Sequence, residues 1–194
     1  PNYKSREEIL KKVLKDTGSI IVHPYNDLKI VEGQGTVALE LIEKCKDLDI
    51  IISPVSGGGL LSGVLCFISE INKKIKVYGA EPIEADDTHR SILYGKIQKN
   101  KTTNTICDGL RAQVGTITFP IIKEKVSDIL TVSEEDIISS MRLIWERMKI
   151  IVEPSCSITL AAILKNKNIF KGKKVGLILS GGNVDLNQMP WKVN

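Results

Sequence analysis

Hydrophobic and polar positions along this chain change their spacing in a regular order, from short apolar runs to helical periods and back. The apolar runs predict strands, and they cover residues 19–23, 50–55, 76–80, 128–132 and 174–179. Between them, apolar residues recur every three or four positions, which predicts helices. Strands that alternate with helices predict an α/β fold, with a parallel twisted sheet flanked by helices.

The predicted helices have recognisable beginnings. They run over residues 5–15, 36–45, onward from 60, 137–148 and 154–163. Ser133 is a candidate N-cap with Asp136 three residues later, close to a capping box, and Pro154 suits a first helical turn. The polar stretch 97–105 predicts a loop.

The most distinctive motif is Ser56-Gly57-Gly58-Gly59, which stands between a predicted strand and a predicted helix. Glycines let backbone N–H groups converge without Cβ clashes, and a helix N-terminus adds positive potential. The motif lacks the Gly-Lys-Ser/Thr ending of a Walker loop and the spaced glycines of a dinucleotide fingerprint. It therefore predicts a site for a single phosphate, although such a turn also serves strand–helix packing alone.

Four carboxylates lie close together after the strand at 76–80, and they belong to Glu81, Glu84, Asp86 and Asp87. Hard divalent cations prefer such oxygens, completed by main-chain carbonyls and water. Acidic residues at a helix N-terminus also complement the helix dipole without binding any metal. Composition alone favours this second interpretation.

Two further motifs lie at predicted element ends. Ser180-Gly181-Gly182-Asn183 offers a hydroxyl that could bond a heteroaromatic nitrogen or only cap a turn, and Glu153-Pro154-Ser155 is interpreted as a helix cap. Ligands of open α/β sheets bind beyond the carboxyl ends of the strands. The turns at 56–59, 81–87 and 180–183 therefore predict one shared pocket.

Composition narrows the classes of function. The 194 residues are 42% hydrophobic and 26% charged, with a net charge of +4 on scattered lysines, which are ordinary globular values. No aromatic residues interleave with the lysines as in nucleic-acid sites, and no apolar run is long enough to cross a bilayer. We therefore expect neither a nucleic-acid partner nor a membrane span.

Single residues have plainer interpretations. The cysteines lack CxxC spacing and predict reduced core thiols of a cytoplasmic protein, without a disulfide framework or zinc site; they are Cys45, Cys66, Cys107 and Cys156. His23 is interpreted as a structural histidine, and Trp145 and Met148 as core residues.

Taken in order, the motifs resemble one family. They are the runs 33–40, 54–63, 78–82 with 85–87, 108–110, 145–149 with 153–155, and 179–186. The series resembles the serine racemases and the threonine/serine dehydratases, which are pyridoxal-phosphate (PLP) enzymes of the tryptophan synthase β-like fold. The likeness covers nearly the whole chain.

The resemblance implies roles for particular residues. The phosphate of PLP would be held by Ser56, Gly57, Gly58, Gly59 and Leu60. Ser180 would bond the pyridine nitrogen and leave it unprotonated. The carboxylates of Glu81 and Asp87 and the carbonyl of Ala85 would hold a divalent cation, Mg²⁺ or else Ca²⁺ or Mn²⁺, which reverses the preference from composition.

Two departures from the family pattern matter. Ser56 stands where relatives often carry glycine, so its hydroxyl could bond the phosphate or crowd it. The lysine that carries the cofactor, in a Ser-Phe-Lys-x-Arg-like segment, has no counterpart here, nor do the Ser-x-Asn loop and the opposite-face serine. The resemblance places all of them upstream of Pro1, and no catalytic residue is assigned within the chain.

The resemblance further implies a division of the chain: residues 1–25 would end a small domain, and residues 26–194 would form an incomplete large PLP-binding domain. The intact enzyme would be a homodimer that interconverts L- and D-serine and eliminates water to give pyruvate and ammonia. Lys149 and Asn183 match positions that hold ATP as an effector. A serine/threonine ammonia-lyase, or a lysine-less PLP-binding paralogue without activity, are the alternatives.

Overall fold

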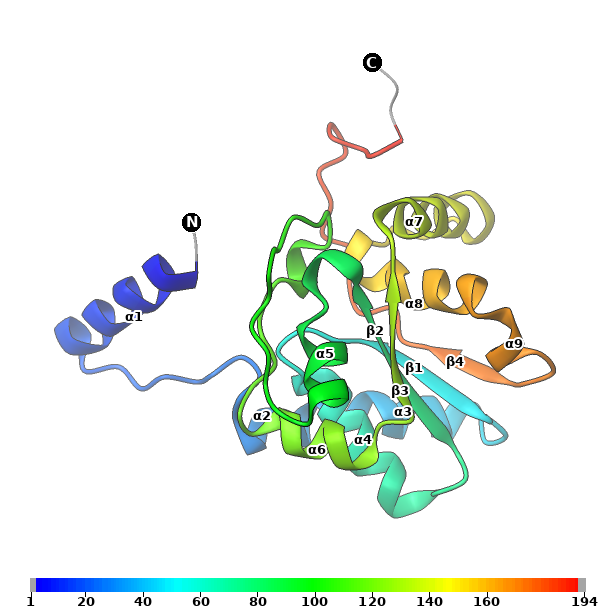
Figure 1. The fold of residues 1–194 in the computed structure, drawn as a ribbon, viewed down its shortest axis with the longest axis horizontal. Helices are drawn as coiled ribbons and strands as arrows, with labels where there is room; N and C mark the ends of the chain where they lie inside the picture. Colours follow the sequence, from blue (N-terminus) through cyan, green and yellow to red (C-terminus); the bar gives the residue numbers. More distant parts are fainter. Residues whose placement is uncertain (1–2, 192–194) are drawn as a thin grey trace.

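The computed structural model describes residues 3–191, with the side chains described from residue 8 onward. At its centre lies a sheet of parallel strands in the order β3-β2-β1-β4 (Figure 1). The strands are β1 (Ile50–Pro54), β2 (Lys76–Pro82), β3 (Asp128–Val132) and β4 (Val175–Leu177). In register, Ser53 of β1 lies opposite Gly79 of β2, and Ala80 of β2 opposite Leu130 of β3.

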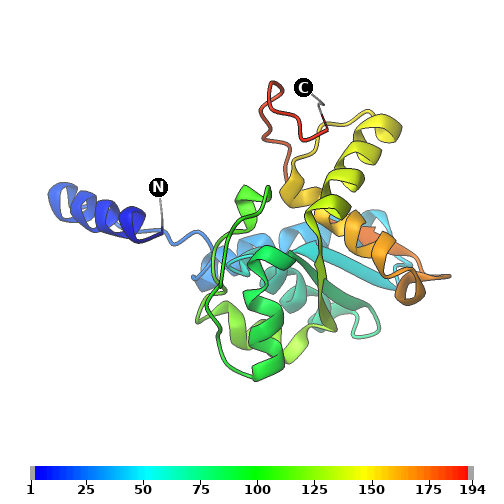
Figure 2. The same cartoon turned by 45° about the horizontal axis from the view of Figure 1, so that its top comes forward.

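The helices connect these strands and cover both faces of the sheet (Figure 2). In chain order they are α1 (Tyr3–Thr17), α2 (Leu28–Gln34), α3 (Thr36–Lys44), α4 (Gly59–Ile71), α5 (Asp87–Tyr94), α6 (Thr118–Lys125), α7 (Glu134–Met148), α8 (Pro154–Lys165) and α9 (Lys167–Phe170). Two single turns of 3₁₀-helix, η1 (Ile83–Ala85) and η2 (Asp108–Leu110), precede α5 and α6.

Alternate residues of each strand face opposite layers, which creates two hydrophobic cores. On one face, Ile51 packs with Leu61 of α4 and Ile122 of α6. On the other face, Ile52 packs with Ile137 of α7 and Ile158 of α8. Each such buried side chain contributes about 1.5–3 kcal/mol to folding, so the two cores fix the sheet that positions the site.

Most predicted elements are confirmed, including the α/β architecture and the loop at 97–105. The capping box of α7 is present, because the Ser133 hydroxyl accepts the Asp136 N–H while Asp136 accepts the Ser133 N–H. The last strand is shorter than predicted and ends at Leu177. No helix among residues 3–191 is both long and apolar enough to cross a membrane.

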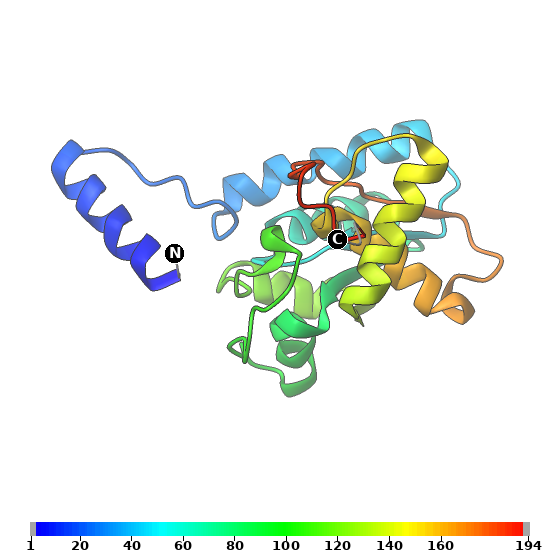
Figure 3. The ribbon, with the colours of Figure 1, turned by 90° about the horizontal axis from the view of Figure 1, so that it is seen from above.

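The predicted strand at 19–23 is wrong. The segment is an extended connection without regular secondary structure, and Ile20 is 91% exposed. A strand needs a hydrogen-bonded neighbour, and none lies beside this segment in the described part of the chain. In the view from above, α1 stands apart from the body at the end of this connection (Figure 3), and its apolar residues Ile9 and Val13 are exposed.

Two core assignments also need correction. Met148 is exposed because it lies at the end of α7, beyond the part that packs on α8, whereas Trp145 is half-buried against Trp191. Cys45 is exposed because it follows the last turn of α3, and Cys66 is only half-buried. Cys107 and Cys156 are buried as predicted.

Candidate functional site

A cavity of about 950 Å³ opens beyond the carboxyl end of β1. Its walls include the predicted phosphate loop from Ser56 to Leu60, and Ser180 from the turn after β4. The structure therefore brings these two predicted elements together. Glu81 and Asp87 do not line this cavity, so the prediction of one pocket shared by all three turns is corrected to two turns, with the acidic turn forming a separate site.

Packing demands the three glycines of the phosphate loop. Gly58 has φ +91°, and a Cβ there would lie 2.8 Å from Thr118 Oγ1. A Cβ on Gly57 would lie 2.4 Å from the ring of Tyr25, and one on Gly59 would lie 2.9 Å from Tyr25 Cβ. Side chains at these positions would push the chain apart, so the loop can only be built from glycine.

The same loop leads into the N-terminus of α4. Ser62 N–H donates to the Gly58 carbonyl, which is the first hydrogen bond of the helix. The N–H groups of Gly59, Leu60 and Leu61 therefore have no partner within the helix. Converging N–H groups and the positive end of the helix dipole make an anion site, so packing and phosphate binding are compatible uses of one loop.

The Ser56 hydroxyl makes a contact that the sequence did not foresee. It donates to the Ala112 carbonyl at 3.1 Å and accepts from the Ala112 N–H at 3.0 Å. Neither alternative considered for it, bonding a phosphate or crowding it, includes this use. The partner lies 56 residues further along the chain, too far for a local sequence pattern to reveal.

Glu153 shapes the turn that carries Ser180. Its backbone N–H donates to the Gly181 carbonyl at 3.1 Å, and its carboxylate accepts the Asn183 N–H at 2.9 Å. Its side chain makes no capping bond to α8, so the interpretation of Glu153 as a helix cap is corrected. A Cβ on Gly181 would lie 2.8 Å from the Glu153 carboxyl group, which explains why this turn needs a glycine.

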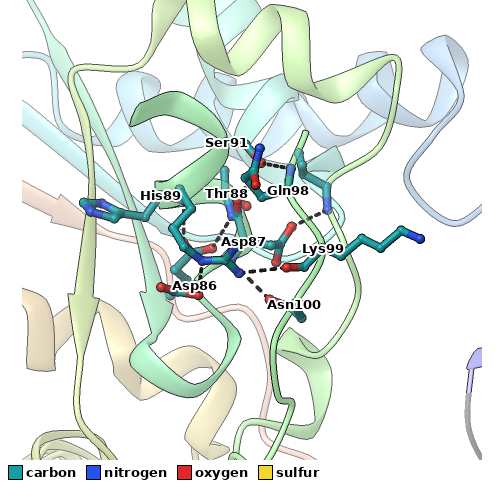
Figure 4. Close-up of polar contacts among 11 residues, drawn as sticks. Asp86, Asp87, Thr88, His89, Ser91, Gln98, Lys99 and Asn100 are labelled. Carbon is teal, nitrogen blue, oxygen red and sulfur yellow. Dashed lines mark hydrogen bonds and ion pairs between the residues drawn. The ribbon is translucent and has the colours of Figure 1, made fainter. Parts of the chain in front are cut away.

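Glu81 and Asp87 lie in the acidic turn after β2, and both are buried. Glu81 accepts N–H groups from the first turn of α5, from His89 at 2.6 Å and from Thr88 at 3.3 Å. Asp87 accepts the Val114 N–H at 2.8 Å, and its own N–H donates to the Asn100 side chain at 3.1 Å (Figure 4). The helix-dipole interpretation is thus realised, since a carboxylate from β2 satisfies the start of α5.

The carboxylates are nevertheless under-compensated. Burial raises the pKa of Glu81 well above its usual value, and the nearby Asp87 raises it further. Burial also raises the pKa of Asp87 to about 6, although the bond from Val114 opposes this. Arg90, the nearest cation, pairs with Asp86 at 2.7 Å.

Two neutral polar atoms beside these carboxylates are also left over. Thr88 Oγ1 and Asn100 Nδ2 are buried and make no hydrogen bond within the described residues. Buried polar groups of this kind usually find a partner, often an ordered water. A hydrated cation would supply both the missing positive charge and the missing water. Residues 3–191 hold no group of three or more His, Cys, Asp and Glu suited to a metal, whereas the predicted site needs only two carboxylates and a carbonyl.

Several cavity residues were missed by the sequence analysis: Tyr25, Asp108, Arg111 and Ser155. The Ser155 hydroxyl accepts the Gly109 N–H at 3.0 Å, which holds η2 over the start of α8. Arg111 is the only cationic residue that lines the described cavity, and its guanidinium donates to the Thr105 carbonyl. Tyr25 could have been suspected, because His23 is confirmed as structural: its Nδ1 accepts the Asn26 N–H at 2.9 Å and shapes the turn that places Tyr25.

Lys149 and Asn183 lie outside the residues that line the cavity. Lys149 ends α7 with φ 59°, the one described residue other than glycine with a left-handed backbone. Asn183 is exposed and is tied to Glu153 through its backbone, so its side chain is not needed for that contact.

Comparisons with known proteins agree with this geometry. The profile of the pyridoxal-phosphate dependent enzymes matches residues 1–181. Serine racemase of Dictyostelium discoideum is 50% identical over 98% of this chain, and a beta-hydroxyaspartate dehydratase of Paracoccus denitrificans is 44% identical over 98%. The chain spans only 60% and 61% of the length of these two relatives.

Solved structures show the same fold. Maize serine racemase superposes with a TM-score of 0.93 at 43% identity, covering 96% of this chain and 58% of that one. A bacterial-type comparison is given by the T.th. threonine deaminase, which superposes with a TM-score of 0.91 at 37% identity, covering 95% and 62%. The predicted tryptophan synthase β-like architecture thus has close counterparts among both racemases and deaminases.

Proposed function

Because this chain belongs to the pyridoxal-phosphate-dependent enzymes, with serine racemases and threonine deaminases as relatives, we propose that it forms the cofactor-binding part of a serine racemase. The intact enzyme interconverts L- and D-serine and also removes water from serine to give pyruvate and ammonia. One observation carries the proposal: the glycine loop and Ser180 line the same cavity.

The residues present fit this cofactor. Three glycines that tolerate no Cβ leave backbone N–H groups from Gly57 to Leu60 free of side-chain cover, at the positive end of α4. When bound, PLP supplies an electron-withdrawing ring that acidifies the Cα–H of an amino acid. The loop holds the phosphate, and the Ser180 hydroxyl orients the ring nitrogen as a neutral partner, which leaves that nitrogen unprotonated.

We also propose a divalent cation, with Mg²⁺ as the first choice and Ca²⁺ or Mn²⁺ as alternatives. Glu81 and Asp87 would contribute carboxylates, and buried Ala85 its carbonyl. The support is the pair of buried carboxyl groups with raised pKa values and the unpaired polar atoms beside them. Carboxylate and carbonyl oxygens are the ligands that Mg²⁺ and Ca²⁺ prefer.

The remaining parts of the proposal concern the whole protein. Residues 1–25 would end a small domain and residues 26–194 belong to the large one, and two copies would pair as a homodimer. ATP would bind as an effector through Lys149 and Asn183, which both lie close in sequence to the Glu153-centred turn or within it. Four free thiols are typical of a reducing compartment, which supports a cytoplasmic enzyme.

The test uses the intact protein that carries this chain. PLP titration followed by absorbance should show saturable binding, and purified holoenzyme should form D-serine from L-serine and pyruvate from either. Pyruvate without D-serine would identify a serine/threonine ammonia-lyase instead. Bound PLP without either product would favour the lysine-less paralogue, and absence of PLP binding would refute the proposal.

A second candidate substrate is a 3-hydroxy amino acid with a second carboxylate. One relative at 44% identity is a beta-hydroxyaspartate dehydratase, and Arg111 offers a cation at the cavity wall. Arginine suits a carboxylate because its planar fork can donate two parallel hydrogen bonds. If this candidate holds, Arg111→Gln lowers kcat/KM for 3-hydroxyaspartate about tenfold or more, as expected for a lost charged hydrogen bond, and leaves that for serine nearly unchanged.

A further inference from the structure

Residues 112–115, which we call the linking segment, touch both proposed binding sites. At one side, the Val114 N–H donates to Asp87 at 2.8 Å. At the other side, Ala112 exchanges two hydrogen bonds with Ser56, and the Gly115 N–H donates to the Gly57 carbonyl at 3.1 Å. One short segment thus connects the acidic turn to the glycine loop.

The linking segment is also packed tightly in place. Thr118 Oγ1 donates to the Gly57 carbonyl at 2.6 Å and accepts the Gly115 N–H at 3.0 Å, which adds a second tie to the loop. A Cβ on Gly115 would lie 2.4 Å from Asn26 Oδ1, an atom that itself accepts the Ile117 N–H at 2.7 Å. Val114 and Gly115 are buried, so a shift of Val114 would be passed to the loop rather than absorbed by solvent.

We propose that the linking segment couples cation binding at Asp87 to phosphate binding at the glycine loop, with the Ser56 hydroxyl as a positioning residue. The inference rests on the function proposed above. A cation fixes the Asp87 carboxylate, and with it the acceptor of the Val114 N–H. Ser56 and Thr118 then hold the other end of the segment against the loop whose N–H groups face the phosphate.

Such coupling is reciprocal, because the cation must change the affinity for PLP by the same factor as PLP changes the affinity for the cation. Coupling between sites typically amounts to about 5-fold or more. We therefore expect saturating Mg²⁺ to tighten PLP binding by about this factor relative to EDTA. The same factor should appear when PLP is added to a Mn²⁺ titration followed by electron paramagnetic resonance.

The decisive variants are Ser56→Ala and Ser56→Gly, measured in the intact protein. Both keep the backbone N–H for the phosphate and remove only the hydroxyl that ties Ala112. Each should bring the Mg²⁺ effect on PLP affinity close to none, while Mn²⁺ affinity without PLP stays at the wild-type value. Thr118→Val, which removes the second tie, should also reduce the coupling.

The matched control is Ser69→Ala on α4, whose hydroxyl contacts only the Cys66 carbonyl and should leave the coupling unchanged. A wild-type protein that binds both PLP and Mn²⁺, but with independent affinities, would overturn the coupling and leave the proposed function standing. Full coupling in both Ser56 variants would overturn the role of Ser56. Failure of the wild-type protein to bind PLP would overturn the proposed function and the coupling together.

Discussion

The glycine loop and the acidic turn follow neighbouring strands at the same edge of the sheet, yet they are built in opposite ways. The loop after β1 has no side chains at 57–59 and offers backbone N–H groups at a helix N-terminus. The turn after β2 offers two buried carboxylates, of which Glu81 already uses the helix N-terminus next to it. The loop should therefore fail when atoms are added, and the turn should fail when charge is removed.

The largest effect is expected from Gly58→Ala. The new Cβ would lie 2.8 Å from Ile122 Cδ1 and 2.9 Å from Thr118 Cβ, at φ +91°. Overpacking and left-handed strain together should cost about 2–5 kcal/mol of the free energy of unfolding. Urea denaturation measures this loss, and PLP titration should show no saturable binding.

Gly172→Ala is the matched control, because Gly172 has φ +73° but nothing lies within 4 Å of a Cβ there. It should lose only the strain, about 1–2 kcal/mol, and keep full PLP affinity. Equal losses in the two variants would show that backbone conformation alone, and not the close packing of the loop, requires glycine at position 58.

The acidic turn should respond in the opposite sense to Asp87→Asn and Glu81→Gln. Each variant removes one of two buried like charges, so the cation-free protein should be about as stable as wild type. Each also removes a proposed ligand, so Mg²⁺ affinity should fall at least about tenfold, the loss expected for one charged interaction. Thermal denaturation with Mg²⁺ and with EDTA measures both quantities, and the Mg²⁺-dependent rise in Tm should disappear.

Asp86→Asn serves as the control for this pair. Asp86 is adjacent in sequence but forms an ion pair with Arg90 on α5 and is not a proposed ligand. It should lose a few tenths of a kcal/mol and keep the Mg²⁺ response. A Mg²⁺ response that survives in Asp87→Asn would move the cation, if one binds, away from this turn.

The two regions also differ in how far the sequence could predict them. The glycine loop was found from local signals, because a strand, a run of glycines and a helix start lie close together in the chain. The same holds for the strands around it and for the capping box at Ser133. Local patterns of this kind determine local structure, and the fold followed from their order.

Contacts between distant segments could not be predicted in the same way. The bond between Ser56 and Ala112, and the contact between Gly57 and the ring of Tyr25, depend on tertiary packing alone. The strand predicted at 19–23 failed for a related reason, since apolar residues form a strand only beside another strand. For the acidic turn, composition favoured a helix dipole and the family resemblance favoured a cation. The structure shows Glu81 serving the helix, while the two raised pKa values support the cation as well.

The smallest effect concerns thiol reactivity, which reports on both regions without changing them. Burial raises the pKa of Cys107, just before the linking segment, to about 12, and raises that of Cys66, on the helix after the glycine loop. At pH 8 the reactive thiolate of Cys107 is then about 1,000-fold scarcer than for a thiol at the ordinary value. In a timed labelling experiment read by mass spectrometry, exposed Cys45 should react first, Cys66 later, and Cys107 only through unfolding. Raising the pH by about two units from neutral should speed Cys45 and leave Cys107 protected, and labelling of Cys107 as fast as Cys45 would show that the segment between the two sites opens freely.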